Sequence, residues 1–323
     1  AVIGLGRGDF QRALGDNVQV TTQIFNAGPS AMEALFANQI DVTYIGPGPA
    51  INGYVRSSGE ALRIISGAAS GGAVFVVRND SGINSPQDLA SKKFATPELG
   101  NTQDIALRNY LLDNGLNTIE KGGNVEVLTA KNPDIVTLFA TKQIDGAWVP
   151  EPWGETLVKD VGGRIFVDER DLWPPEGKFV TAHIIVRPEY LQNNPDVIKK
   201  LLEAHIDATN WINSNKAAAI DAFNVELQKL TQKTTPVDVL NASLSRIDFT
   251  YDPIRLSLFQ DASDAFNLGF LPENPDVSGI YDLTILNQVL QERGLPLISG
   301  GDVAGTNATG TNATSALVSS DTG

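Results

Sequence analysis

The chain has 323 residues, which is long enough to bury a large core and favours two lobes over one small module. It contains no cysteine, so disulfides, thiolate metal sites and a cysteine nucleophile are excluded within it. A formal net charge of −14 disfavours nucleic acid and anionic membrane surfaces as partners, and no run of eighteen apolar residues predicts a membrane span.

Strand-like runs alternate with amphipathic helical stretches in the first half of the chain. We expect strands at Val18–Phe25, Ile40–Ile45, Leu62–Ser66, Ala73–Val77, Lys93–Thr96, Val125–Leu128, Gly146–Val149, Arg164–Val167 and His183–Val186. We expect helices at Ser30–Ala37, Pro47–Ser57, Ser85–Ala90, Thr102–Asn114 and Asn132–Thr141. Such alternation is typical of parallel α/β sheets.

The second half of the chain is mainly helical by its apolar spacing. We expect helices at Asn194–Asn213, Lys216–Gln232, Pro236–Ile247, Ile254–Leu268 and Thr284–Arg293. The composition changes again near Gly300, because residues 301–323 are rich in Gly, Thr, Asn, Ala and Ser and cannot bury a core. This last segment is therefore predicted to be a flexible tail.

Four N-glycosylation sequons are present, and two of them lie in tandem in the tail. The acceptor residues are Asn79, Asn241, Asn307 and Asn312. Isolated sequons arise by chance, whereas the tandem pair in a Thr- and Ser-rich segment favours a glycosylated extracellular stalk. We therefore keep anchoring of the protein at the cell surface through this tail as a hypothesis.

The alternating region contains a weak internal repeat, with one copy in each of its halves. Residues Gln39–Pro49 align with Gln143–Trp153 at a constant offset, and each copy reads as a helix, a turn, a strand and a proline-rich loop. One interpretation is that any α/β unit shows such residues at this place. The other is that two similar lobes each present a loop to a shared cleft, because ligands of open α/β sheets bind outside the carboxyl ends of strands.

Glycine- and proline-rich helix starts are the main candidate binding elements. The segment Gly46–Pro49 follows a strand and opens a helix, where free backbone N–H groups and the helix dipole suit an oxyanion. The glycines of Ser66–Ala73 would let the backbone approach a ligand, although glycine also relieves a simple crossover. Residues Asn101–Gln103 place three neutral hydrogen-bonding side chains at one helix start, more than capping alone requires.

The loop Trp148–Trp153 sets a carboxylate between two prolines and two tryptophans at the end of a strand. Here Glu151 could accept a hydrogen bond from an amine, and Trp153 could cover an apolar or cationic group. The alternative is that both tryptophans belong to the core and that the carboxylate is solvated.

Signals for catalysis and for cofactors are weak. The only two histidines, His183 and His205, lie far apart in the sequence, and no Gly-x-Ser-x-Gly motif is present for a catalytic triad. The glycines of Gly4–Gly8 lack the spacing of a dinucleotide-binding turn. We therefore predict no enzyme activity, no cofactor and no metal site.

Several segments together resemble one protein family, the nitrate/sulfonate/taurine-type substrate-binding proteins of ABC importers. The segments are Gly28–Ser30 with Glu33–Leu35, Gln39–Asp41, Tyr44–Pro47, Ser70–Gly72, Thr96–Asp104 and Glu151–Trp153. They occur in the family's order and at fitting spacing from the start of the chain to about Gly269. The similarity is specific for the family and unspecific for the solute.

The resemblance implies a two-lobed α/β fold of the type II periplasmic-binding-protein class, in which each lobe is a sheet flanked by helices. Lobe 1 would comprise residues 1–75 and 185–300, and lobe 2 residues 76–184, with crossovers near Val74–Arg78 and His183–Arg187. The implied ligand-binding residues are Tyr44, Gly46, Pro47, Gly48, Ser70, Gly71, Gly72, Asn101, Thr102, Gln103, Glu151 and Trp153.

The resemblance also implies the biological role. The protein would bind a small anionic or zwitterionic solute, such as an alkylsulfonate, taurine or nitrate, by closing its lobes, and would deliver it to an ABC permease outside the cytoplasm. Family members begin with a strand before the first helix, so either the numbered chain is truncated or part of the pocket comes from residues upstream of Ala1, and the sequence does not decide between the two.

Three alternatives stay open at this point. The same fold could bind a heteroaromatic solute, such as a thiamine-precursor pyrimidine, stacked on Trp148, Trp153 and Tyr44. The chain could be an enzyme that uses Glu151, or a surface glycoprotein that has kept a receptor fold.

Overall fold

Two separate β-sheets organise the protein in a computed structural model that describes residues 1–298. The first sheet has the strand order β1-β8-β2-β9, and the second has the order β5-β4-β6-β3-β7. The first contains β1 (Val42–Ile45), β2 (Arg63–Gly71), β8 (Val180–Val186) and β9 (Ile247–Phe249). The second contains β3 (Ala73–Arg78), β4 (Lys93–Thr96), β5 (Glu126–Thr129), β6 (Gly146–Pro150) and β7 (Gly163–Asp168).

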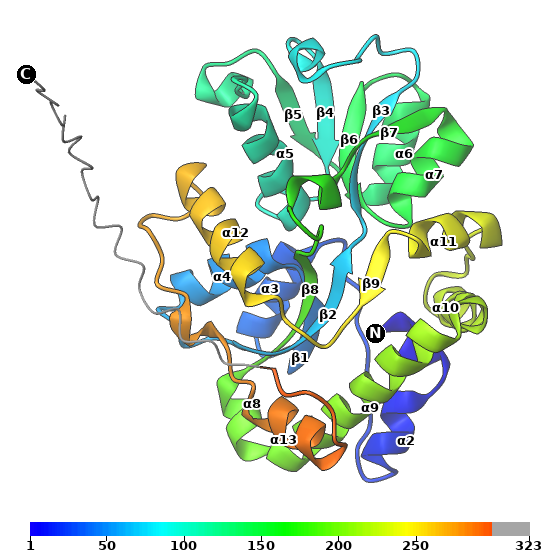
Figure 1. Cartoon of the computed structure of the whole chain (residues 1–323), viewed down its shortest axis with the longest axis vertical. Coiled ribbons are helices and arrows are strands. Elements are labelled where there is room, and N and C mark those ends of the chain that lie inside the picture. Colours follow the sequence, from blue (N-terminus) through cyan, green and yellow to red (C-terminus); the bar gives the residue numbers. More distant parts are fainter. Residues whose placement is uncertain (299–323) are drawn as a thin grey trace, which may run out of the picture.

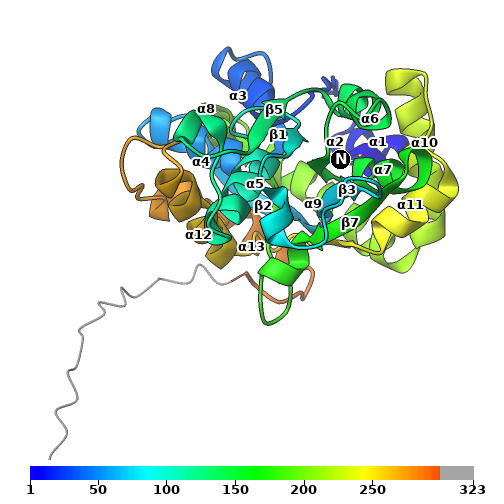
Figure 2. The same ribbon diagram turned by 90° about the horizontal axis from the view of Figure 1, so that it is seen from above.

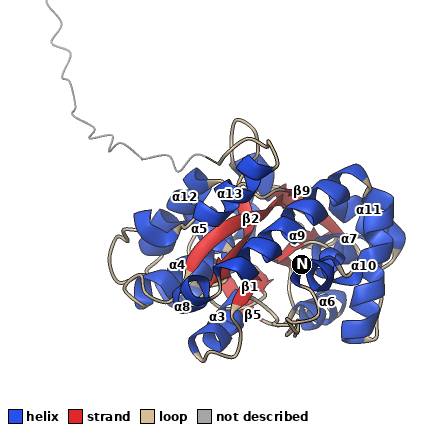
Figure 3. Cartoon of the chain, turned by 90° about the horizontal axis from the view of Figure 1, so that it is seen from below, coloured by secondary structure: helices blue, strands red, loops and turns tan. Residues whose placement is uncertain are grey.

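Helices cover both sheets (Figure 3). The first half of the chain forms α1 (Val2–Gly6), α2 (Asp9–Leu14), α3 (Gly28–Phe36), α4 (Pro47–Arg56), α5 (Thr102–Asp113), α6 (Asn132–Ala140) and α7 (Trp153–Val161). The second half forms α8 (Pro188–Asn193), α9 (Pro195–Ser214), α10 (Lys216–Thr231), α11 (Val237–Leu244), α12 (Arg255–Asn267) and α13 (Thr284–Glu292). Four short 3₁₀ turns occur at Pro86–Leu89, Ile119–Lys121, Glu169–Leu172 and Ser278–Ile280.

The chain passes from one sheet to the other twice. It leaves the first sheet at Gly71 and enters the second at Ala73, and it returns between the end of β7 and the start of β8. The second sheet with α5, α6 and α7 lies above the first sheet in Figure 1, and β2 leads directly into β3 between them. The result is the expected fold of two lobes, each built of a sheet with flanking helices.

The second sheet is buried on both faces. Along β3, Phe75 and Val77 pack with α5 residues on one face, whereas Val74 and Val76 pack with α6 and α7 residues on the other. All four side chains are fully buried, and each contributes about 1.5–3 kcal/mol of hydrophobic stabilisation. The near-continuous apolar run of β3 is the pattern that a strand buried on two faces requires.

The prediction of parallel sheets is wrong for most strand pairs. Strand β4 runs parallel to β5 and β6, but β3 runs antiparallel to both β6 and β7. In the first sheet, β8 returns from the other lobe and lies between β1 and β2, antiparallel to both. Sequence alternation cannot reveal this, because the direction of β8 is set by the return crossover and not by its neighbours in the chain.

The strand predicted at Val18–Phe25 is absent. This segment is mostly exposed and has no strand assignment, and Ile24 keeps 59% of its surface exposed. An alternating pattern forms a strand only when a neighbouring strand pairs with it. Within residues 1–298, the nearby strand β1 pairs with β8 alone, so Val18–Phe25 has no partner strand. Helices α1, α2, α7 and α8 and strand β9 were not expected; α7 begins inside the proline-rich loop, and the three-residue β9 lies between two helices.

The internal repeat is confirmed at the level of backbone geometry. After α3, Asn38 adopts a left-handed φ of 56°, and after α6, Lys142 adopts a φ of 59°. Each helix closes with the same Schellman hydrogen bond, from Gln39 N to Ala34 O at 2.9 Å and from Gln143 N to Leu138 O at 2.8 Å. Both copies then continue through a strand, β1 or β6, into a helix, α4 or α7.

Candidate functional site

Two helix starts from different lobes meet at the first group of predicted residues. Helix α4 begins at Pro47 and α5 at Thr102, and Gly48 N donates to Thr102 Oγ1 at 3.4 Å. A Cβ on Gly46 would lie 2.3 Å from the same Oγ1. Glycine is therefore needed at position 46 for the lobes to approach this closely, and the two positive helix ends converge.

Most of the polar capacity of Asn101 and Gln103 is used within lobe 2. The Asn101 side chain accepts from Asp104 N at 2.8 Å, which caps α5, and donates to Gln103 Oε1 at 2.9 Å. The fully buried Asp104 carboxylate accepts from Thr96, Gly100 N and Arg108. The group thus orders the start of α5.

The glycines at the end of β2 serve the crossover between the lobes. Gly71 and Gly72 have φ values of 72° and 77°, which favour glycine. A Cβ on Gly71 would lie 2.4 Å from Arg246 O, and one on Gly72 would lie 2.5 Å from Ile247. Ser70 Oγ accepts from Phe179 N at 3.3 Å. These residues pack against the chain itself at the point where it changes sheets.

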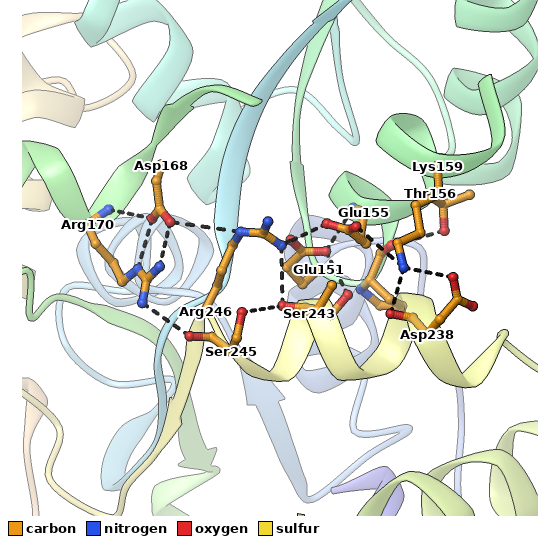
Figure 4. Close-up of polar contacts among 12 residues, drawn as sticks. Glu151, Glu155, Thr156, Lys159, Asp168, Arg170, Asp238, Ser243, Ser245 and Arg246 are labelled. Carbon is orange, nitrogen blue, oxygen red and sulfur yellow. Dashed lines mark hydrogen bonds and ion pairs between the residues drawn. The ribbon is translucent and has the colours of Figure 1, made fainter. Parts of the chain in front are cut away.

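The Glu151 carboxylate lies in a polar cluster that joins the lobes (Figure 4). Its side chain is fully buried, and Oε1 accepts from Arg246 Nη1 at 3.0 Å. Oε2 accepts from Glu155 N at 3.0 Å and from Ser243 Oγ at 2.9 Å. Burial raises the pKa of Glu151, although these hydrogen bonds and the guanidinium oppose the rise.

The same guanidinium serves a second buried carboxylate. Arg246 Nη1 also donates to Glu155 Oε2 at 2.9 Å. Further out, Lys159 Nζ donates to Asp238 Oδ2 at 2.7 Å, across the contact between α7 and α11 (Figure 4). Arg246 was not singled out from the sequence, because its partners lie more than 90 residues away and no local motif marks it.

Of the two tryptophans of the repeat, Trp148 belongs to the core of lobe 2 and Trp153 lies partly buried beside that core. Trp148 is fully buried, stacks on Phe75 with ring centroids 5.3 Å apart, and donates from Nε1 to Glu169 at 2.7 Å. Burial raises the pKa of Glu169 to about 7. Trp153 packs against the apolar cluster that contains Phe139. Stacking of a heteroaromatic solute on Trp148 is thus wrong, since its ring has no accessible surface.

A cavity of about 340 Å³ lies on the side of lobe 1 that meets lobe 2, and most of its lining comes from lobe 1. Glu151 and Pro152 contribute from lobe 2, and Tyr44, Ala69 and His205 contribute from lobe 1. The structure therefore brings Tyr44 and Glu151 together at one cavity. The other predicted residues lie outside this lining, at the contact between α4 and α5, at the crossover and, for Trp153, partly buried against the core of lobe 2.

A larger hollow of about 640 Å³ follows the free edge of β1. Its walls include the whole of residues 18–25 on one side and residues 39–46 on the other. Tyr44 borders both this hollow and the inter-lobe cavity. Figure 2, in which the molecule is seen from above, shows α1 and α2 beside α9 in this part of the fold.

Other predictions concern residues away from the cleft. Asn79 and Asn241 are exposed, whereas Asn307, Asn312 and the tail at residues 301–323 lie outside the described residues. Residues 1–298 contain no group of three or more potential metal ligands. In that same range, none of the helices combines the length and the apolar character that crossing a bilayer demands.

Comparison with known proteins places this geometry in a family. A putative binding protein of Brucella abortus is 30% identical over 220 residues, which are 68% of this chain and 63% of the relative, so the chain spans less than two thirds of it. The taurine-binding periplasmic protein of Escherichia coli is 27% identical over 187 residues, covering 57% of this chain and 54% of that protein.

A solved structure supports the fold. The alkanesulfonate-binding protein SsuA from Xanthomonas axonopodis pv. citri, bound to MOPS, superposes with a TM-score of 0.71 at 18% identity, over 87% of this chain and 95% of that one. The model of the NMT1-like family matches residues 2–225, which is more than half of the sequence. The chain therefore belongs to the NMT1-like family.

Proposed function

We propose that the protein is an extracytoplasmic solute-binding protein of an ABC importer and performs no chemistry. It captures a small solute that bears an oxyanion, such as an alkylsulfonate, taurine or nitrate, between its lobes. The observation that carries this proposal is the cavity of about 340 Å³ on the side of lobe 1 that meets lobe 2. The taurine-binding and alkanesulfonate-binding proteins to which the chain is similar support the solute class.

The lobes would move as two bodies about the crossovers. One crossover lies at Gly72 and the other between Leu172 and Val180, a few residues before the boundaries expected at 75 and 184. The starts of α4 and α5 already meet in this arrangement of the lobes, and their N–H groups would face an oxyanion bound beside this contact. The closed form is the one that an ABC permease would recognise.

Several donors must act together to give useful affinity. A micromolar dissociation constant corresponds to about −8 kcal/mol, whereas one exposed helix end contributes only about 0.3–1 kcal/mol. The closed cleft must therefore exclude water and preorganise its donors. The net charge of −14 does not increase the affinity for an anion, because the mean field of the protein repels anions.

A thermal-shift panel of taurine, alkylsulfonates, nitrate and amino acids tests the proposal. A solute present at 100 times its dissociation constant adds about 2.7 kcal/mol, which raises Tm by several degrees. We expect at least one oxyanion to do so. No response to any of them would contradict the proposal.

A variant at the lobe contact provides the structural control. Gly46→Ala places a Cβ 2.3 Å from Thr102 Oγ1 and obstructs closure. Because the described structure already makes this contact, we expect a lower Tm of the unliganded variant as well as loss of the shift caused by the solute. A full shift in this variant would show that binding does not require the approach of α4 to α5.

A further inference from the structure

We propose that a latch on the side of the molecule away from the crossovers holds the two lobes closed, with each lobe supplying a polar group to a helix start of the other. The latch consists of Asn26 and Ser30 of lobe 1 and of Pro97, Glu98 and Asn132 of lobe 2. None of these five residues lines either hollow described above. The latch would act on closure, and hence on retention of the solute, without touching the solute, so it rests on the proposed function.

Helix α6 of lobe 2 begins without a capping side chain of its own. Its N-cap residue, Lys131, makes no side-chain hydrogen bond to the helix start. Asn26 of lobe 1 supplies this partner, because its Oδ1 accepts from the backbone N of Asn132 at 3.4 Å and its Nδ2 donates to Pro97 O at 2.9 Å. The first N–H groups of a helix have no partner within the helix, so α6 obtains from lobe 1 a contact that it lacks in lobe 2.

Helix α3 of lobe 1 has the complementary arrangement. Its N-cap residue is Ala27, which has no side-chain acceptor. From lobe 2, the Glu98 carboxylate reaches the first turn of α3, where Ser30 Oγ donates to Oε1 at 2.8 Å and lies 3.0 Å from Oε2. A carboxylate is favourable at this end of a helix because the helix dipole is positive there. The segments Gly28–Ser30 and Thr96–Asp104, which stand apart in the sequence, thus meet across the two lobes.

The latch lies farther from the crossovers than the polar cluster of Arg246. Strand β3 carries the first crossover, and the Pro97–Glu98 loop follows β4, which is separated from β3 by β6. Two strand spacings place this loop about 10 Å from β3. In contrast, Arg246 lies directly at the crossover, since a Cβ on Gly71 would lie 2.4 Å from its carbonyl O. Rotation of the lobes about the crossovers would therefore separate the latch while the Arg246 cluster moves less.

The latch is reversible because its polar groups are incompletely satisfied. Within residues 1–298, Oδ1 of the buried Asn132 side chain has no hydrogen-bond partner. A buried acceptor without a partner is unfavourable, and opening of the lobes would let water reach it. Against this, Ser30 donates to a charged group, a kind of hydrogen bond that shifts an equilibrium by about tenfold or more. Loss of that hydrogen bond should therefore be enough to open the lobes measurably.

Electron–electron dipolar spectroscopy of the whole chain without solute tests the latch directly. Because the chain contains no cysteine, Ala37→Cys in lobe 1 and Ala140→Cys in lobe 2 place one spin label on each lobe, both at exposed positions. We expect Ser30→Ala to lower the ratio of short to long label distances about tenfold, since it removes the hydrogen bond to Glu98. Ser30→Thr keeps a hydroxyl and should retain the short distance.

The matched control is Ser214→Ala, which removes a serine hydrogen bond inside lobe 1, from Oγ to Asn210 O at 3.0 Å. It should leave the label distances unchanged. Asn26→Ala weakens the latch at its other helix start and keeps the test decisive if Ser30→Ala does not fold. Short distances that persist in both latch variants, or a wild type without the short distance, would overturn the proposal.

Addition of taurine distinguishes failure of the latch from failure of the proposed function. We expect taurine to restore the short distance in Ser30→Ala, with an affinity about tenfold lower than in the wild type, although Ser30 lines neither hollow. Equal taurine affinity of the two proteins would overturn the latch and leave the proposed function intact. If the latch variants open but taurine, propane-1-sulfonate and nitrate all leave the distances unchanged, the latch is supported and the proposed function is contradicted.

Discussion

The two copies of the repeat share a backbone and use it differently. Tyr44 and Trp148 are equivalent positions of β1 and β6, and each ring donates one hydrogen bond, to His205 and to Glu169 respectively. Strand β1 is an edge strand among the described residues, so Tyr44 borders a cavity. Strand β6 lies between β4 and β3, so Trp148 is fully buried.

This difference shows that position in the sheet decides the role of a side chain. The helix, the left-handed turn and the strand fix where the aromatic residue stands, while the number of neighbouring strands decides whether it meets a ligand or the core. The same holds for the loops that follow. The β1–α4 loop touches the other lobe through one long hydrogen bond, whereas the β6–α7 loop carries the buried Glu151–Arg246 ion pair.

The largest expected effect comes from truncating the two aromatic residues. Trp148→Ala should lower the free energy of unfolding by about 3–5 kcal/mol, because it leaves a large cavity in the core and an unpaired Glu169. Tyr44→Ala should cost clearly less, since the ring already borders open space. Urea denaturation of both variants measures this, and equal losses would break the comparison.

The two ion pairs that join the β6–α7 region to lobe 1 should differ in strength because one is buried and the other is exposed. Arg246→Met leaves Glu151 and Glu155 buried without their cation and should cost about 3 kcal/mol. The control is Lys159→Met, whose partner Asp238 is largely exposed, and it should cost at most about 1 kcal/mol. Similar small losses in both variants would mean that the polar cluster does not stabilise the lobe contact.

Titration of Glu169 tests the buried environment of Trp148. The folded pKa of about 7 lies above the ordinary value of 4.5, so the folded state holds the proton more tightly than the unfolded one. The contribution to stability is therefore complete below about pH 4.5 and is lost as the pH rises through 7. Tryptophan fluorescence should change with a midpoint near pH 7.

The neutral variant Glu169→Gln isolates this effect from the buried histidines. Burial lowers the pKa of His183 to about 4 and that of His205 to about 3, so both make stability rise with pH below about 6.5. The difference in stability between the wild type and Glu169→Gln removes these contributions. A fluorescence midpoint near 7 that persists in the variant would assign the titration to another group.

The smallest effect concerns the left-handed residues of the repeat. Lys142→Gly should stabilise the protein by about 1 kcal/mol or less, because relief of the strain at a φ of 59° outweighs loss of the exposed ion pair with Asp80. Asn38→Gly should gain less, since Asn tolerates this conformation and its side chain accepts from Arg187 at 2.9 Å. Thermal unfolding compares the two, and a larger gain at position 38 would contradict the argument.

Most elements of the fold could be predicted from local patterns. Strand β4 lies where the pattern predicted it, at Lys93–Thr96, and the repeat gave the turns before Gln39 and Gln143. Those features depend on residues close in sequence. The failed strand at Val18–Phe25 had a suitable alternation, but a strand also needs a neighbour, which local sequence does not specify.

The candidate site was less predictable for the same reason. Local motifs marked Glu151 and Tyr44, and both line the cavity. They did not indicate that Glu151 is held by Arg246, or that Tyr44 is oriented by His205 on a distant helix. The sequence of its loop suggested that Trp148 contacts a ligand. The strands β4 and β3 on either side of β6 instead place Trp148 in the core.

A crystal structure of the chain grown with taurine tests the central claim most directly. The account predicts one taurine molecule between the lobes, with its sulfonate towards the starts of α4 and α5. A cleft with no solute at saturating taurine, or taurine bound only away from the place where the lobes meet, would contradict it.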